Sequence, residues 1–150
     1  MHIRSIVALC AVLTAASAPA FAQFAKPEDA IKYRKNALFV MQQNFSRVAA
    51  MAAGKAPFDA KVAAESAEVA EYVGRLPWAA FGAGTDKGDT RAKPEVWSDG
   101  AKFKAAADKL QAELANLSKA AKAGNLDAIK PAVQATGGAC KSCHDAFRKE

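Results

Sequence analysis

The pentapeptide Cys140-Lys141-Ser142-Cys143-His144 lies close to the C-terminal end of this 150-residue chain. On a helix, residues three and four positions apart share a face, so the two thiols and the imidazole project to the same side. C-x-x-C-H is the spacing of covalent haem attachment: the two cysteines bond the porphyrin vinyl groups and the imidazole binds the iron. The motif therefore predicts one covalent haem c, with thioether links to Cys140 and Cys143 and with His144 as the iron ligand.

Paired cysteines also occur in dithiol redox sites, in structural zinc sites and in the disulfides of exported proteins. A redox C-x-x-C belongs to a βαβ surround, whereas this chain is rich in alanine and favours helix. Structural zinc needs a second pair of ligands, which the chain does not contain. Haem attachment therefore remains the preferred interpretation.

The N-terminal 22 residues have the pattern of a secretory signal peptide. A short basic region that includes Arg4 precedes an apolar run, and Ala20-Phe21-Ala22 supplies an A-x-A cleavage site. The apolar run is too short to span a bilayer, and no later stretch reaches the roughly 18 apolar residues of a membrane helix. We expect residues 1–22 to be cleaved and residues 23–150 to form one soluble domain in a bacterial periplasm, without membrane association.

Cleavage leaves His144 as the only histidine, because His2 is removed with the leader. Two histidine ligands within one chain are therefore excluded. The sixth iron position is predicted to be empty, or filled by Met41, Met51, a lysine or an external ligand.

The net charge of the full chain is +6, and cleavage also removes Arg4. The basic residues are scattered along the sequence and are not interleaved with aromatic residues, so nucleic-acid binding is a poor interpretation. A solvated surface explains the charge.

Four amphipathic segments follow the leader. The first helix is expected to run from Pro27 to about Gly54, because a proline followed by two acidic residues is typical of a helix start. Asp59 is an expected N-cap for a second helix that ends at Leu76, a third runs from Pro94 to Lys122, and a fourth begins near Asn125 with a bend or turn at Pro131. The expected apolar stripes are Ile31, Leu38, Met41, Phe45, Val48 and Ala52; Val62, Ser66, Val69, Val73 and Leu76; Val96, Phe103, Ala107, Leu110, Leu114, Leu117 and Ala121; and Ile129, Val133, Cys140, His144 and Phe147. These stripes predict an all-α, antiparallel four-helix bundle.

Arg34 interrupts the first apolar stripe. A cation there is costly unless it is paired, so it either extends to solvent at a bundle end or meets a buried anion such as a haem propionate. The Gly-rich connection from Trp78 to Pro94 is long for a bundle, and is either a flexible crossover or a flap over the haem edge.

The mature chain resembles the cytochrome c' family of class II c-type cytochromes, whose haem motif lies at the C-terminal end of a four-helix bundle. The resemblance rests on residues 23–30, Tyr33-Arg34, residues 76–81, Trp97-Ser98-Asp99 and residues 140–148. It implies that Leu38 fills the distal face of a five-coordinate haem. It also implies that Arg34, Lys35 and Asp89 lie at the haem periphery, that Phe81 lines the pocket, and that Arg148 lies near the proximal face. Lys35 departs from the glutamine common in the family, and the loop after Asp89 is longer than usual.

The same resemblance implies a protein that binds nitric oxide or carbon monoxide and forms a homodimer. Tyr33, Phe39 and Val40 lie off the first apolar stripe and give the first helix a further apolar surface, which also suggests packing against a second subunit. The resemblance is also compatible with electron transfer to a redox partner that the sequence does not identify. An aliphatic Leu38 blocks the iron without ligating it. The alternative is a low-spin electron carrier with Met41 as sixth ligand. An enzyme such as a peroxidase or nitric oxide reductase is not expected, because no distal histidine or acid accompanies Leu38 on its helix.

Overall fold

The computed structural model describes residues 23–150, so the predicted signal peptide lies outside the described residues. Four long helices dominate this part of the chain: α1 (Pro27–Ala52), α2 (Ala60–Val73), α4 (Gly100–Lys122) and α5 (Leu126–Phe147). A 3-10 turn, η1 (Pro77–Ala80), and a one-turn helix, α3 (Glu95–Ser98), lie in the connection between α2 and α4. The predicted four-helix architecture is confirmed.

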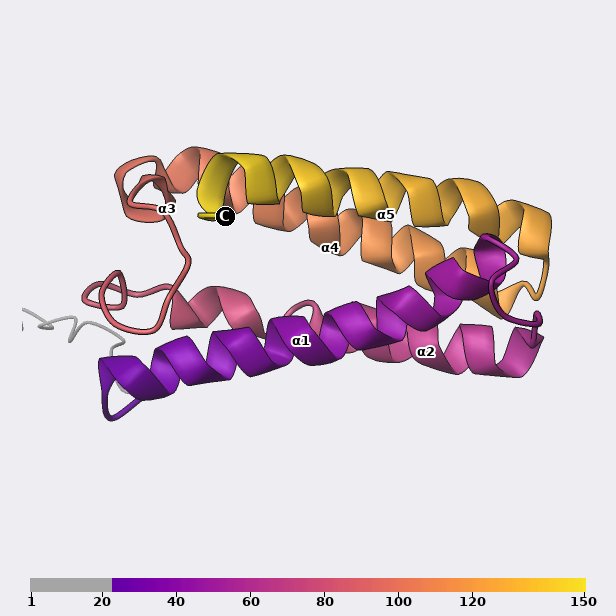
Figure 1. Cartoon of the computed structure of the whole chain (residues 1–150), viewed down its shortest axis with the longest axis horizontal. Coiled ribbons are helices and arrows are strands. Elements are labelled where there is room, and N and C mark those ends of the chain that lie inside the picture. Colours follow the sequence, from indigo (N-terminus) through magenta and orange to yellow (C-terminus); the bar gives the residue numbers. More distant parts are fainter. Residues whose placement is uncertain (1–22) are drawn as a thin grey trace, which may run out of the picture.

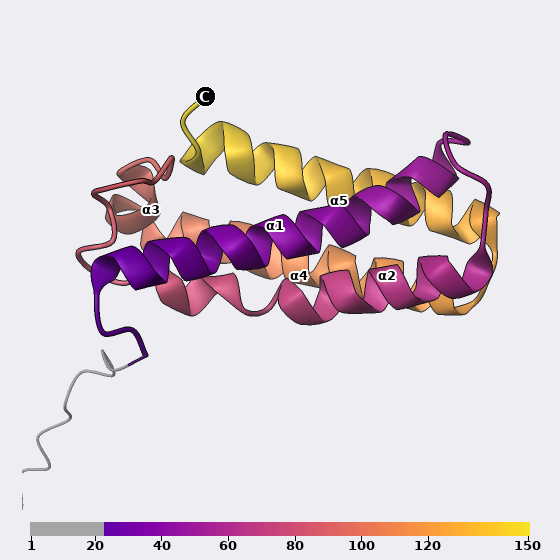
Figure 2. The ribbon, with the colours of Figure 1, turned by 60° about the horizontal axis from the view of Figure 1, so that its bottom comes forward.

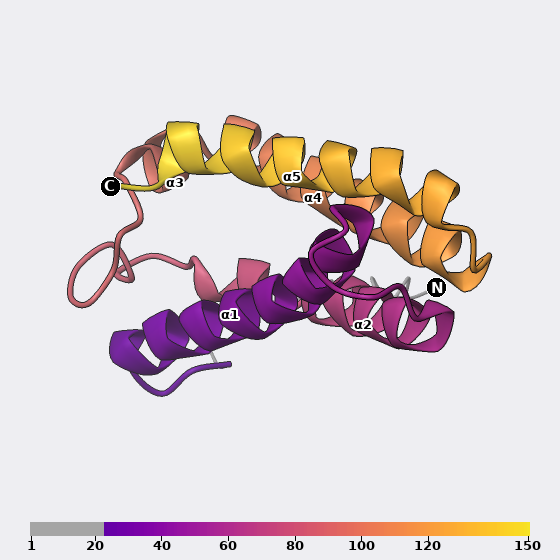
Figure 3. The same ribbon diagram turned by 45° about the vertical axis from the view of Figure 1, so that its right-hand side comes forward.

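The helices form an antiparallel bundle in which each long helix runs against the one before it (Figure 1). Packing follows the chain, with α1 on α2, α2 on α4, and α4 on α5. Helices α1 and α5 approach each other at the end where α5 begins and diverge toward the C-terminus (Figures 1 and 3). The long connection with η1 and α3 lies at that open end, and Figure 2 shows it beside the last turns of α5.

Local sequence explains most helix boundaries. Pro27 is the first residue of α1 and is followed by two acidic residues near the positive end of the helix dipole. Asp59 caps α2 by accepting from the Val62 amide, and Asn125 caps α5 by accepting from the Asp127 amide. Helix α5 continues through Pro131 without the predicted separate turn.

The third predicted helix is wrong in one respect, because it breaks at Asp99. The Asp99 backbone has φ −125° and ψ 54°, outside the helical region, and its carboxylate accepts from the Lys102 amide as the N-cap of α4. The expected stripe from Val96 to Ala121 is otherwise buried, except for the partly exposed Phe103.

The predicted apolar stripe of the second helix is wrong at Val62 and Val69, whereas Ser66 is buried and Val73 packs on the core as expected. Helix α2 buries Ala63, Ser66, Ala67 and Ala70, whereas Val62 and Val69 are 39% and 40% exposed. Small side chains face the core because α2 lies close to α4. A Cβ atom at Gly74 would lie 2.5 Å from Cδ1 of Leu114, so only glycine permits this approach. The helix ends at Val73, three residues before the predicted Leu76.

Two groups of buried side chains form the core. One, around Val48, Leu117 and Ile129, fills the end of the bundle where α1 meets α5. The other, around Met41, Leu110 and Leu114, lies nearer the open end and is bordered by Leu38, Trp78 and Cys140. Within residues 23–150, no helix is both long and apolar enough to cross a bilayer.

Candidate functional site

A cavity of about 690 Å³ lies between the diverging halves of α1 and α5. Its volume falls in the range of about 300–1,000 Å³ typical of ligand and cofactor sites. Helices α1, α4 and α5 and the connection between α2 and α4 all contribute to its walls. Every site residue predicted from the sequence lines it: Arg34, Lys35, Leu38, Phe81, Asp89, Cys140, Cys143, His144 and Arg148.

Helix α5 supplies the three residues of the haem motif. Cys140 and Cys143 are free, partly buried thiols, and burial raises the pKa of both. Burial lowers the pKa of His144, and the nearby charges of Arg148 and Arg91 lower it further. The motif therefore presents two protonated thiols and a neutral imidazole to one cavity. Thiols of this kind can add across vinyl groups, and a neutral imidazole can ligate iron.

Helix α1 lines the opposite side of the cavity with Leu38 and Met41. Leu38 is partly buried and packs on the core group that contains Met41, Leu110 and Leu114. Met41 is only 6% exposed, and its sulfur lies 3.4 Å from the position that a Cβ atom would take at Gly74. The thioether thus packs toward the end of α2, while Leu38 and Cys140 both border the same core group.

Aromatic side chains form the end wall of the cavity. Phe81 packs on Phe103 with ring centroids 4.8 Å apart, Phe103 packs on Phe147 at 5.3 Å, and Trp78 packs on both Phe81 and Phe103. Sequence reasoning assigned Phe103 and Phe147 only to apolar stripes. Their positions on the third and fourth stripes, with Phe147 one turn after Cys143, were the available signal that they share a wall.

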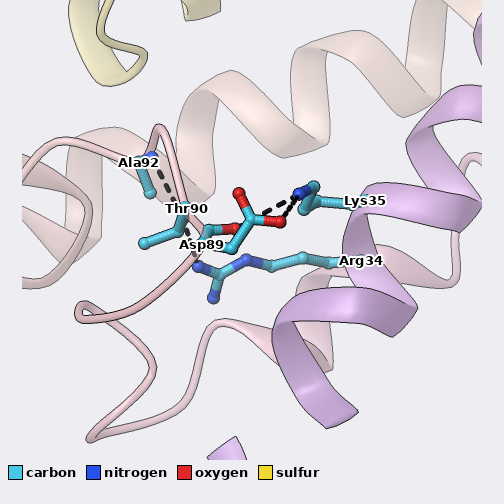
Figure 4. A network of polar contacts seen from close by, with 5 residues as sticks. All are labelled: Arg34, Lys35, Asp89, Thr90 and Ala92. Carbon is cyan, nitrogen blue, oxygen red and sulfur yellow. Dashed lines mark hydrogen bonds and ion pairs between the residues drawn. The ribbon is translucent and has the colours of Figure 1, made fainter. Parts of the chain in front are cut away.

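Arg34 projects from α1 into the long connection and is 2% exposed. Its guanidinium donates to the Ala80 carbonyl at 3.0 Å, to Oγ1 and the carbonyl oxygen of Thr85 at 2.8 Å each, and to Oγ1 of Thr90 at 2.7 Å. It also lies 4.3 Å from the centroid of the Phe81 ring. Figure 4 shows the guanidinium directed at Thr90. Arg34 therefore anchors the connection to α1, so of its two predicted roles extension to solvent is wrong, and contact with a haem propionate stays a prediction.

All four acceptors of the Arg34 guanidinium are neutral, and among the described residues no carboxylate pairs with it. Burial lowers its pKa, with no anionic partner to oppose the shift. Thr85 and Thr90 were missed by the sequence reasoning, since nothing in a Gly-rich loop distinguishes the threonines that will meet a buried cation.

Replacing Arg34 by methionine should lower the free energy of unfolding by about 3 kcal/mol, because hydrogen bonds to a charged donor are lost and buried acceptors are left unpaired. For a domain of this size the midpoint of thermal unfolding should fall by about 10 °C. Thermal unfolding followed by circular dichroism would measure this midpoint. Arg47→Met is the matched control on the same helix, since Arg47 is exposed and bonds only Asn44. Equal melting temperatures for the two variants would contradict the anchoring role.

Two further pairs border the cavity. Lys35 contacts the Asp89 carboxylate at 2.5 Å, which ties α1 to the loop at an exposed site (Figure 4). Arg148 places Nη1 3.4 Å from Nε2 of His144. Arg91, which sequence reasoning did not single out, lines the same rim.

The described residues fit a haem in their chemistry. Both thiols and the single imidazole line one mostly apolar cavity, Leu38 covers the side opposite α5, and a buried cation without an anionic partner lies at its edge. A helical bundle with a C-terminal C-x-x-C-H motif in such a cavity defines the class of c-type haem proteins with a four-helix fold.

Comparison with known proteins identifies the family within this class. Residues 29–148 match the profile of the family described as Cytochrome C'. Cytochrome c' from Rubrivivax gelatinosus is 57% identical over 129 residues, which cover 85% of this chain and all of the relative. Cytochrome c' from Alcaligenes xylosoxydans is 48% identical over 128 residues, covering 85% of this chain and 99% of the relative. The chain belongs to the cytochrome c' family.

Comparison with solved structures gives the same family. The crystal structure of the Rubrivivax gelatinosus protein has a TM-score of 0.82 at 58% identity, and covers 85% of this chain and all of that one. A nitric oxide complex of a leucine-to-alanine mutant of the Alcaligenes xylosoxidans protein has a TM-score of 0.80 at 46% identity, covering 85% and 99%. A carbon monoxide complex of a leucine-to-glycine variant of that protein has the same TM-score and identity, covering 85% and all of the chain.

Proposed function

We propose that this chain is a periplasmic gas-binding protein that carries one haem c, bonded through Cys140 and Cys143 and ligated by His144 alone. The bound haem would supply an iron with one open coordination position. The observation that carries the proposal is that Leu38 lines the cavity from α1, while Cys140, Cys143 and His144 line the same cavity from α5. Leu38 has no atom that ligates iron and no hydrogen-bond donor, so it favours small uncharged ligands such as nitric oxide and carbon monoxide.

The buried charge of Arg34 supports a haem at this site. A nearby anion would stabilise the positive charge of a buried guanidinium whose acceptors are all neutral. A haem propionate at the cavity edge would supply such an anion. Lys35, Arg91 and Arg148 add positive charge to the same rim, while Asp89 is engaged by Lys35. These residues would orient the polar edge of the porphyrin toward the loop and leave its apolar edge toward Leu110 and Leu114.

Visible absorption spectra of the pure ferric and ferrous protein test the proposal. High-spin spectra without added ligand, together with new bands on addition of nitric oxide or carbon monoxide, are expected. Low-spin spectra without added ligand would contradict an open iron position.

The low-spin alternative, in which Met41 is the sixth ligand, makes a separate prediction. Met41→Leu preserves the side-chain volume and removes the sulfur, so a Met41-ligated protein would change from low to high spin. We expect the spectrum of Met41→Leu to equal that of the unmodified chain, because the sulfur packs against Gly74, the residue that follows α2. A change of spin state in this variant would favour the electron carrier.

Catalysis of peroxide or nitric oxide turnover ranks last. Among the residues that line the cavity, the acid Asp89 is paired with Lys35, and the imidazole of His144 is assigned to the iron. No group remains beside Leu38 to move a proton. Turnover faster than that of free haem would revive this possibility.

A homodimer through α2 is the remaining part of the proposal. Val62, Val69 and Tyr72 form one outward stripe on α2 and are 39%, 40% and 67% exposed. A second copy is the occupant that the family suggests, and the stripe is separate from the cavity. Val69→Lys should convert a dimer into a monomer in sedimentation velocity runs, whereas Ala105→Lys, at an exposed position of α4 outside the stripe, should not. A monomeric unmodified protein at tens of micromolar would contradict the dimer.

The proposed location follows from the pattern of residues 1–22. N-terminal sequencing of protein purified from the periplasmic fraction should begin at Gln23.

A further inference from the structure

The C-terminal end of α5 is joined to the long connection by a short antiparallel bridge. Ala92 and Arg148 lie opposite each other, the Lys93 amide donates to the Phe147 carbonyl at 2.9 Å, and the Lys149 amide donates to the Arg91 carbonyl at 2.8 Å. We call this contact between residues 91–93 and 147–149 the C-terminal clasp.

The C-terminal clasp determines where α5 stops. Arg148 has φ −122° and ψ 131°, an extended conformation, although its amide still donates to the His144 carbonyl at 3.0 Å. A bridge to Ala92 requires extended backbone, so the helix ends at Phe147. Because the hydrogen bonds flank the Ala92–Arg148 pair, these two residues form the closer, non-hydrogen-bonded type of antiparallel pair. The small Ala92 side chain therefore lies beside the stem of Arg148.

This placement matters for the iron ligand. Arg148 returns its guanidinium to His144, with Nη1 3.4 Å from Nε2. The position of that cation depends on the backbone of Arg148, and this backbone is held by the clasp.

Thr90 connects the clasp to α1. Its hydroxyl oxygen accepts from the Arg34 guanidinium at 2.7 Å and from the Ala92 amide at 3.2 Å. Figure 4 shows Thr90 between these two groups. A series of contacts thus runs from Arg34, one turn before Leu38 on α1, through Thr90 and Ala92 to Arg148 and His144 on α5. The Thr85 hydroxyl also accepts a hydrogen bond from Arg34. It donates to the Gly82 carbonyl, however, and makes no hydrogen bond to the clasp.

We infer that Thr90 is a positioning residue for the axial ligand: by joining the Arg34 guanidinium to the Ala92 amide, it holds Arg148 beside His144. Its hydroxyl is the one side-chain group, among the described residues, that bonds both Arg34 and the clasp. Loss of the hydroxyl releases Ala92, loosens the bridge and lets Arg148 move relative to the imidazole. The inference rests on the proposed role of His144 as iron ligand.

The test uses the holoprotein with Thr90→Val, which removes the hydroxyl at nearly constant volume, and Thr85→Val as the matched control. The readout is the iron–histidine stretching band of the ferrous protein in resonance Raman spectra. Thr90→Val should shift or broaden this band, Thr90→Ser should restore it, and Thr85→Val should leave it unchanged although it also loses a hydrogen bond to Arg34. An unshifted band in Thr90→Val would overturn the inference.

A double-mutant cycle checks the route. If Thr90 acts through Arg148, the shift caused by Thr90→Val should vanish in an Arg148→Gln background, because coupled residues are not additive. A shift of the same size in that background would also overturn the inference.

Hydrogen exchange supplies a second readout that does not depend on the iron. The Lys93 and Lys149 amides should exchange about tenfold faster in Thr90→Val, corresponding to loss of one hydrogen bond in the series. Unchanged exchange would contradict a link between Thr90 and the clasp.

Should Thr90→Val fail to accumulate, Thr90→Ala removes the same hydroxyl. If the unmodified protein gave no iron–histidine band, the proposed ligation by His144 would fail, while the exchange measurement would still decide the role of Thr90.

Discussion

The double variant Cys140→Ser/Cys143→Ser will retain no haem after denaturation. Serine is nearly isosteric with cysteine, but its hydroxyl does not add across a vinyl group to form a thioether as a thiol does. The test is expression in cells that mature c-type cytochromes, followed by haem staining of a denaturing gel. The unmodified chain should stain strongly, and the double variant should lose essentially all of the stain.

Single variants provide the controls. Cys140→Ser and Cys143→Ser each keep one thiol at the cavity, so each should retain covalent haem, with a pyridine haemochrome spectrum between those of haem b and haem c. Full staining of the double variant would contradict attachment at the motif. Because Cys10 lies in the predicted leader, a Cys10→Ser variant should stain like the unmodified chain.

Leu38→Ala is expected to change ligand access, by an amount second only to the loss of haem in the double cysteine variant. Removing the branched end of this side chain opens the side of the cavity that faces α5, and the ferrous protein should bind carbon monoxide at least about tenfold faster and more tightly, a change of about 1.4 kcal/mol. Flash photolysis or stopped-flow mixing measures the rate. Leu76→Ala is the control, because Leu76 is partly buried but does not line the cavity. Unchanged carbon monoxide association would show that Leu38 is not the barrier.

Periodicity identified the fold because three of the four apolar stripes contain large side chains at bundle spacing. Leu110, Leu114 and Leu117 are all buried as expected. Helix α2 was misread at two positions because its buried side chains are alanine and serine, while Val62 and Val69 face outward. Hydrophobicity alone ranks Val69 above Ala70, but the close approach of α2 to α4 at Gly74 reverses that order.

The site was predictable to the extent that it is local. Cys140, Cys143 and His144 follow from spacing, and Leu38 and Arg34 from the resemblance and from the interrupted stripe. The partners of Arg34 were not predictable, because Thr85 and Thr90 lie about fifty positions away in a loop with no periodicity. Likewise, the clasp joins residues 91–93 to the C-terminus through backbone groups, which carry no sequence signal.

The cavity also bears on how the protein acquires its stability. The cavity of about 690 Å³ is far larger than the voids of a well-packed core, and large apolar side chains such as Leu38, Phe81 and Phe103 line it. A domain of this size is stable by only about 5–15 kcal/mol in total. A haem bound there would cover these walls and act as part of the hydrophobic core as much as a reactive centre, so we expect the native bundle and the attached haem to form as one cooperative unit. The wall that carries Cys140, Cys143 and His144 belongs to α5, which follows α1, α2 and α4 in the chain, so closure of the site should wait until α5 has been synthesised.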